Sequence, residues 1–249
     1  MLLTYRLIFL IFFFFGAQSI AAYQPGKWSP MDVYVEQGRE GGPISLVLKN
    51  SDGQMLETAK FEYDRNGRLM KEKFYSAKGK YTGVTEYTYV NNVVSLEILK
   101  DAKGNIISTK EFKWGKKTLN VIVMDNNGKI IMRHYIRHKN YRVTSGREKD
   151  ETSEDQFQVQ YDKKGKAVKF KLIRTDGSSI SEIHYMYDSS GKLTARLLKN
   201  NSFESKCVYK YDLNGNIISF TYFNQGPGKW IKDRSMILTY GQKKILSNL

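Results

Sequence analysis

Hydrophobic and polar residues alternate along most of this chain, between turn signals that recur about every twelve residues. In one segment Val168, Phe170 and Leu172 alternate with Lys169 and Lys171. Successive side chains of a β-strand point to opposite faces, so the pattern predicts strands with one packed face and one solvated face. Together with the regular turn spacing, it predicts an all-β antiparallel meander of hairpins, and no long amphipathic helix is indicated.

The turns carry a recurring signature in which Asp is followed three residues later by Gly. Asp at the first position of a type I turn accepts hydrogen bonds from the backbone, and the Gly takes the positive φ that a G1 bulge needs. Asp101–Gly104 and Asp125–Gly128 lack a preceding tyrosine, and four other copies follow one directly. The predicted turn residues in these four are Asp64, Gly67, Asp162, Gly165, Asp188, Gly191, Asp212 and Gly215.

The sequence also repeats over a longer period than the spacing of its turns. Aromatic pairs two residues apart precede alternate turns, as in Tyr185 with Tyr187 and Tyr209 with Tyr211. The repeating unit is therefore two strands and two turns, and such units bury a shared core by stacking. About 14 strands are expected, in a single strongly curled or spiral sheet, because an open sheet rarely exceeds about 10 strands without curling or splitting. The aromatic pairs are expected to be structural, with an exposed stacking platform as the alternative.

The repeat resembles the YD repeats of bacterial Rhs-type surface and secreted proteins. The residues that carry the resemblance are Tyr185–Leu193 and Tyr209–Ile217, with half-repeats such as Asp101–Ile106 between full copies, and it covers roughly residues 45 to 225. The resemblance implies a curling β-sheet and an envelope setting, and carbohydrate binding is associated with some repeats of that family. This chain has too few units for a full shell and no separate C-terminal toxin region.

The N-terminus predicts export. Arg6 precedes an apolar run from Leu7 to Phe15 and a small-residue site at Ser19-Ile20-Ala21, the layout of a secretory signal peptide over residues 1–22. Residues 23–249 are expected to form a single β-repeat domain in the periplasm, at the cell surface or outside the cell, with no transmembrane helix after cleavage. A charged loop is expected at about 137–156, where polar residues of both signs interrupt the rhythm.

The amino-acid composition limits how the fold can be stabilised and which binding partners it favours. Cys207 is the only cysteine, so the exported chain has no internal disulfide and depends on an apolar core. The net charge is +15, and signal cleavage removes only Arg6 from it. A surface this basic favours anionic partners without choosing among them, although export argues against nucleic acid.

No catalytic or metal-binding constellation is apparent, so the chain is predicted to be non-enzymatic and to use no cofactor. His134 and His138 would share a strand face, but neither has a nearby Cys or carboxylate at ligand spacing. Cys207 falls on the apolar side of its strand, where a buried inert thiol is expected. An enzyme built from residues distant in sequence remains an alternative.

The main functional hypothesis is a binding or structural module of the bacterial envelope that engages an anionic polymer or glycan through a basic face. The alternatives are a protein-interaction scaffold using the aromatic-rich ends near Trp28–Tyr34 and Trp230, and an outer-membrane β-barrel. Strands expected to be shorter than roughly 9 to 11 residues argue against the barrel. The candidate ligand-binding residues are Lys169, Lys171, Lys206 and Lys210.

Overall fold

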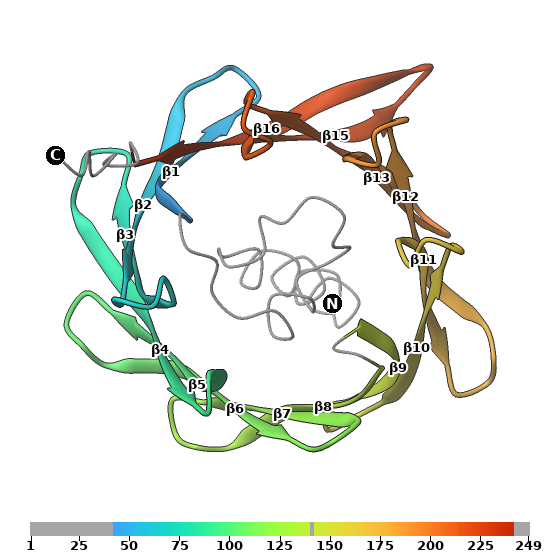
Figure 1. Ribbon diagram of the computed structural model, residues 1–249, viewed down its shortest axis with the longest axis horizontal. Helices are drawn as coiled ribbons and strands as arrows, with labels where there is room; N and C mark the ends of the chain where they lie inside the picture. The colour runs from blue at the N-terminus through green and yellow to red at the C-terminus, as the bar shows by residue number, and fades with distance from the viewer. Residues whose placement is uncertain (1–41, 140–141, 242–249) are drawn as a thin grey trace, which may run out of the picture.

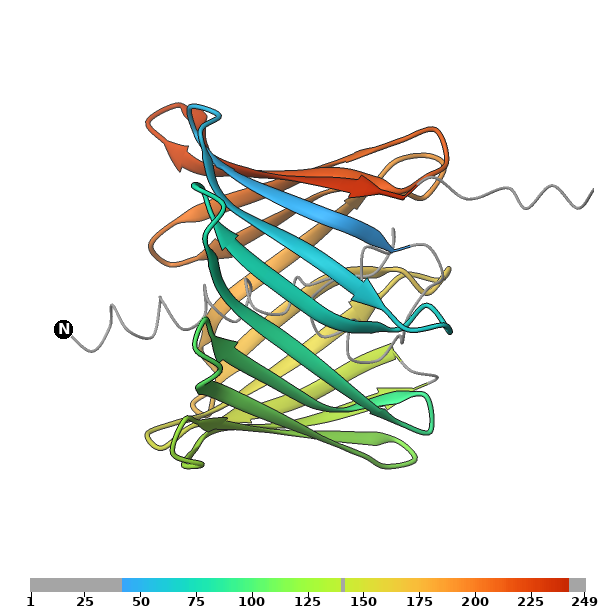
Figure 2. The same ribbon diagram turned by 90° about the vertical axis from the view of Figure 1, so that its left-hand side faces the viewer.

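The computed structural model describes residues 42–139 and 142–241, which form a closed β-barrel (Figure 1). Each strand pairs antiparallel with the next, and β16 pairs with β1 to close the ring. Figure 2 shows the strands running obliquely across the wall. The strands are β1 (Pro43–Asn50), β2 (Met55–Tyr63), β3 (Leu69–Ser76), β4 (Tyr81–Val90), β5 (Val93–Asp101), β6 (Ile106–Trp114), β7 (Thr118–Asp125), β8 (Ile130–Lys139), β9 (Arg142–Lys149), β10 (Glu154–Tyr161), β11 (Ala167–Arg174), β12 (Ser179–Tyr187), β13 (Leu193–Asn200), β14 (Glu204–Tyr211), β15 (Ile217–Gly226) and β16 (Lys229–Tyr240).

The all-β antiparallel meander is confirmed, but the prediction of an open curled or spiral sheet was wrong. The described residues form 16 strands rather than about 14, and Leu46 of β1 pairs with Leu238 of β16. Closure is favourable because it gives the first and last strands the hydrogen-bond partners that two open edges would lack. In this respect the molecule matches the barrel shape of the outer-membrane alternative.

Two local expectations also need correction. The charged loop expected at about 137–156 is instead the end of β8, the whole of β9, a short turn and the start of β10. Arg137, Arg147 and Lys149 of this segment lie on the outward strand face, where solvent reaches their charges without disturbing the strand pairing. The strands contain 8 to 12 residues, so the argument from short strands against a barrel fails. The predicted signal peptide lies outside the described residues, and the described part contains no helix that could cross a membrane.

The two faces of the barrel wall differ sharply in chemistry. In β2, Ala59 and Phe61 are buried, whereas Lys60 between them and Glu62 after them are exposed. The strands form one closed layer, so one alternate set of side chains converges inside the ring and the other diverges outside it. The buried set therefore faces inward. Sequence alternation becomes a mostly apolar and aromatic inner face, with Glu72, Glu97 and Arg196 buried in it, and a polar, charged outer face.

The barrel consists of eight hairpin units, each an odd-numbered strand followed by an even-numbered one. The first inward residue of each unit is apolar and buried. Most are Leu, Val or Ile, whose burial contributes about 1.5 to 3 kcal/mol each. These eight residues are Pro43, Leu69, Val94, Leu119, Val143, Ala167, Leu193 and Ile217.

An aromatic collar ties the two strands of each unit together at one mouth of the barrel. Near the end of seven even-numbered strands, a Tyr hydroxyl or the Trp114 indole donates to the carbonyl of that first inward residue, at distances of 2.6 to 3.0 Å. In the remaining unit, His138 lies near the end of β8 with its ring edge against Trp114. The collar residues are Tyr63, Tyr89, Trp114, Tyr161, Tyr187, Tyr211 and Tyr240.

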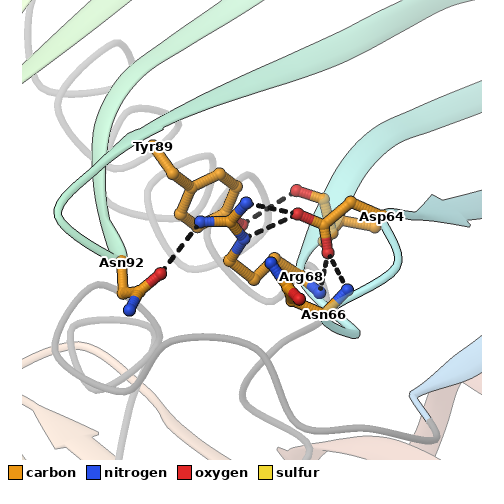
Figure 3. Close-up of polar contacts among 6 residues, drawn as sticks. Asp64, Asn66, Arg68, Tyr89 and Asn92 are labelled. Carbon is orange, nitrogen blue, oxygen red and sulfur yellow. Dashed lines mark hydrogen bonds and ion pairs between the residues drawn. The ribbon is translucent and has the colours of Figure 1, made fainter.

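The four Asp–Gly turns that follow a tyrosine link neighbouring units at the same mouth, whereas Asp101–Gly104 and Asp125–Gly128 lie within units. The Asp64 carboxylate accepts from the backbone N–H groups of Asn66 and Arg68, and Gly67 has a φ of 73° (Figure 3). The Arg68 guanidinium pairs with Asp64, donates to Asn92 in the Asn91–Asn92 turn between β4 and β5, and lies 5.0 Å from the centroid of the Tyr89 ring. Gly165, Gly191 and Gly215 likewise have positive φ. The repeated motif therefore builds a reinforced rim.

Candidate functional site

A hollow of about 490 Å³ lies on the outer face of β7, β8, β9 and β10. This volume falls within the roughly 300 to 1,000 Å³ of small-molecule sites. Most of the lining is polar, with Tyr135 as its exposed aromatic side chain. The lining residues are Thr118, Asn120, Tyr135, Ile136, Arg137, Ser145, Gly146, Arg147, Gln156, Phe157 and Gln158.

Strand register places the outward lining residues in two adjacent rows. The first row runs from Asn120 through Tyr135 and Arg147 to Gln156, each directly opposite the next. The second row, on the same face, is Thr118, Arg137, Ser145 and Gln158. Four adjacent strands span about 14 Å at ordinary spacing. Side chains remote in sequence thus converge on one patch.

The floor of the hollow depends on two small residues of β9. Ser145 faces outward between Arg137 and Gln158, and its short side chain leaves a depression between longer ones. Gly146 has no side chain, and the Phe157 ring occupies the space where its Cβ would lie. A Cβ there would also meet the Tyr135 carbonyl oxygen. Gly146 therefore allows Phe157, which is fully buried, to pack flat against the inside of the same wall.

One side of the hollow is held in place by its own contacts. The Arg147 guanidinium lies 5.4 Å from the centroid of the Tyr135 ring and donates to a Glu154 carboxylate oxygen at 2.8 Å. Lys149 lies 3.8 Å from the same carboxylate. The cation–π contact covers one face of the tyrosine, whose side chain remains exposed to solvent. Arg147 thus orients the aromatic wall.

The other polar groups of the hollow are not committed to one another. Among the described residues, the Arg137 guanidinium has no ion pair and no hydrogen bond. The side-chain amides of Asn120, Gln156 and Gln158 likewise have no hydrogen-bond partner within the described part of the chain. Each amide offers both donors and an acceptor, and the guanidinium offers five donors. The hollow therefore has unused hydrogen-bonding capacity.

Lys169 and Lys171, two of the predicted ligand-binding lysines, are both on β11 and share one carboxylate. The Lys169 Nζ lies 2.7 Å from one Glu182 oxygen, and the Lys171 Nζ lies 3.8 Å from the other. The hydrogen bond from Lys169 lowers the pKa of Glu182 from its usual range, against an opposing effect of burial. This pairing offsets much of the positive charge that the sequence pattern suggested.

Lys206 and Lys210 are on β14, two strands beyond β12, so the four lysines do not form one cluster. The Lys206 Nζ lies 5.0 Å from the Trp230 ring centroid and 5.7 Å from that of Phe223. Of the two aromatic-rich ends, Trp230 lies on β16, and Trp28–Tyr34 lie outside the described residues. Lys210 is exposed and has no ion pair among the described residues.

The remaining chemically interesting residues face inward. Cys207 is buried, and burial raises the pKa of its thiol, which disfavours the reactive thiolate. His134 and His138 are both inward and buried, and His134 Nδ1 lies 3.6 Å from a Glu148 oxygen. Within the described ranges, no group of three or more His, Cys, Asp or Glu residues could hold a metal ion.

Sequence reasoning missed the hollow because Arg137 and all of its residues from β9 fall within the expected charged loop. A signal was present, because Gln156 and Gln158 flank the apolar Phe157. This alternation is typical of a strand. The density of charges concealed it, and no pattern in a single strand reveals which other strands will lie beside it.

Comparison with known proteins gives little further guidance. No protein-family model and no curated protein matches the chain. A porin-like protein from Bacteroides uniformis is 12% identical with a TM-score of 0.39, over 80% of this chain and 96% of that one. A porin-like protein from Bacteroides vulgatus is also 12% identical, with a TM-score of 0.33, over 80% of this chain and 98% of that one. TcdB2-TccC3 is 12% identical with a TM-score of 0.30, over 75% of this chain and 14% of that one. Similarities this low do not establish a common function.

Proposed function

We propose that the chain is an exported, non-enzymatic barrel that stands in water and binds an anionic polymer or glycan through its outer face. The observation that carries the proposal is the division of chemistry between the two faces of the wall. Apolar and aromatic side chains make up most of the inward face, where Glu72, Glu97 and Arg196 are also buried, and lysine, arginine and glutamate side chains recur along the outward face. Water is the environment that such an outer face suits.

Two clusters illustrate why lipid is a poor environment for this surface. Glu86, midway along β4, pairs outward with Lys100 at 2.5 Å and with Lys71 at 3.2 Å. Lys169 and Lys171 flank Glu182 in the same way on β11 and β12. A membrane barrel needs an outward apolar band about 25 Å tall, and a Lys or Arg on its lipid face at the midplane costs about 2 to 4 kcal/mol.

The excess of basic residues supports an anionic partner. The sequence has 40 Lys and Arg residues against 25 Asp and Glu. A positive surface potential raises the local concentration of polyanions and accelerates their association, with a strong dependence on salt. The proposal therefore describes general attraction over the outward face, with binding and no chemical conversion.

An outer-membrane barrel is a second candidate, and closure is the observation that favours it. Sixteen antiparallel strands with no open edge satisfy the requirement that every backbone polar group be paired in lipid. Strands of 8 to 12 residues also suit the roughly 9 to 11 residues of a tilted membrane strand. This candidate would have to accommodate the outward ion pairs in contact with lipid.

One experiment separates the candidates. The chain lacking residues 1–22 is produced without detergent and applied to immobilised polygalacturonate and to neutral dextran. We expect a soluble protein that is retained only by the polyanion and elutes between about 0.05 M and about 0.5 M salt, as screening shortens electrostatic attraction.

Two results would overturn the proposal. A protein that needs detergent and inserts into lipid vesicles would instead support the membrane candidate. Equal retention on dextran, or retention insensitive to salt, would remove the electrostatic basis of binding.

A further inference from the structure

We propose that the hollow on β7–β10 is a specific site for a sugar unit that bears a carboxylate, such as a uronic acid residue. The inference rests on the proposed function and names the ligand class and the residues that recognise it. General attraction spreads over the outward face, whereas this site holds one saccharide unit by shape and hydrogen bonding.

Arg137 would supply the charge recognition. Its guanidinium lines the hollow without an ion pair among the described residues. A guanidinium presents a planar fork of donors that matches the two oxygens of a carboxylate, which makes the pair directional as well as attractive. The hollow has one such uncommitted cation, because Arg147 is bonded to Glu154. The site therefore suits one carboxylate per ligand unit.

The amides around Arg137 match a hydroxyl-rich ligand. Asn120, Gln156 and Gln158 present their donors and acceptors at the margins of the hollow, with Thr118 and Ser145 adding hydroxyl groups. Sugar hydroxyls both donate and accept, so they can satisfy groups of both kinds. An acyl chain would leave these polar groups without partners, at a cost of about 10-fold or more in affinity for each one desolvated.

Tyr135 adds a flat surface beside these polar groups. Its side chain is 36% exposed, and Arg147 covers one face of the ring. The remaining surface offers an apolar plane against which the C–H face of a sugar ring can lie. A tyrosine held by a neighbouring guanidinium loses little freedom on binding, which favours affinity. The tyrosine ring, the side-chain amides and the Arg137 guanidinium together provide the contacts that recognise an acidic sugar.

A nucleic acid fits the hollow less well. Its binding depends on many phosphate contacts spread along a strand, typically accompanied by several basic side chains. Within the hollow, Arg137 is the cation without a partner among the described residues, and Glu154 lies beside Arg147. The acidic residue would repel a continuous run of phosphates, while a single carboxylate can be seated at Arg137.

The test uses titration of the chain lacking residues 1–22 with trigalacturonic acid, followed by calorimetry and by NMR shifts of the Tyr135 ring. Its methyl ester, which keeps the hydroxyls and removes the charge, is the matched ligand control. We expect the acid to bind and the ester to bind at least about 10-fold more weakly, because a charge-assisted hydrogen bond contributes more than a neutral one.

Variants then locate the site. Arg137→Ala is expected to weaken binding of the acid by about 10- to 100-fold, and Arg137→Lys by less, because it keeps the charge and loses the fork. Arg133→Ala is the matched control: Arg133 faces outward on the same strand, opposite Lys149, and does not line the hollow. It should leave the affinity unchanged. Circular dichroism and the melting temperature verify that each variant is folded.

The outcomes separate this inference from the proposed function. If Arg133→Ala and Arg137→Ala weaken binding equally, or the ester binds as well as the acid, the specific site is wrong. Salt-dependent retention of the Arg137→Ala variant on polygalacturonate would then show that general attraction survives. Absence of retention for the unmodified chain would reject the proposed function itself. Displacement of the sugar from the hollow by a short single-stranded DNA would overturn the ligand class.

Discussion

The outer face of β7–β10 and that of β11–β14 share one scaffold but differ in how their charges are used. On β11 and β12, Lys169 and Lys171 surround Glu182, so the conspicuous lysines neutralise a carboxylate. On β8 and β9, Arg137 faces a depression above Ser145 and Gly146 and has no ion pair in the described part of the barrel. Charge density in a sequence therefore does not show which charges the fold leaves unpaired.

The largest expected effect tests whether the floor of the hollow requires glycine at position 146. Gly146→Ala places a Cβ against the Phe157 ring and the Tyr135 carbonyl oxygen, so the strand or the ring must shift. We expect the free energy of unfolding to fall by about 3 kcal/mol, at the upper end of typical overpacking effects. Urea unfolding measures it.

Ser145→Ala is the control for this variant, because the Ser145 side chain faces outward and makes no hydrogen bond among the described residues. It should change stability by no more than about 0.5 kcal/mol. A Gly146→Ala protein as stable as this control would show that the floor of the hollow is not constrained as described.

A medium effect is expected from the aromatic collar, and it should be equal in the two regions. Tyr161 donates to the Val143 carbonyl and Tyr211 to the Leu193 carbonyl, both at 2.6 Å. Tyr161→Phe and Tyr211→Phe each remove a partner of a buried hydrogen bond, which should cost about 1 kcal/mol. Thermal or urea unfolding compares the two. A clear difference between them would mean that the regions differ in framework as well as in outward chemistry.

The smallest expected effect tests whether the ion pairs with Glu182 keep the lysines of β11 from binding the polyanion. Glu182→Gln keeps the shape of the side chain and removes the charge shared by Lys169 and Lys171. We expect retention on polygalacturonate to extend to moderately higher salt, because two cations become available to the polymer. Affinity for trigalacturonic acid should stay the same. Glu204→Gln, which releases Lys199 alone, is the matched control. Unchanged retention would show that the pairing does not limit binding.

Much of the fold could be predicted from the sequence because its determinants are local. Asp64 and Gly67 form their turn with bonds inside five residues, and the same chemistry recurs at Asp188 and Asp212. Alternation within one segment assigned Phe170 and Lys169 to opposite faces. Closure could not be predicted in this way, since the pairing of Pro43 with Tyr240 depends on curvature accumulated over every intervening strand.

The candidate site was beyond sequence reasoning for a related reason. Arg137, Ser145 and Gln158 are opposite one another only because β8, β9 and β10 pair in one register. In an irregular loop, nothing would hold the same polar side chains next to one another. The lysines, in contrast, were conspicuous in the sequence, but their partner Glu182 lies on the next strand, and neither its distance nor its orientation could be derived from spacing.

The pairing of β1 with β16 has a consequence for how the chain can be rewired. Pro43 and Tyr240 are register neighbours, so the ends of the described wall lie next to each other. A short linker could join them, and new termini could be opened at any rim turn between units, such as the one at Asp188–Gly191. Circular permutants of this kind should refold into the same barrel. The hairpin at which the chain begins would then have no effect on the structure that forms.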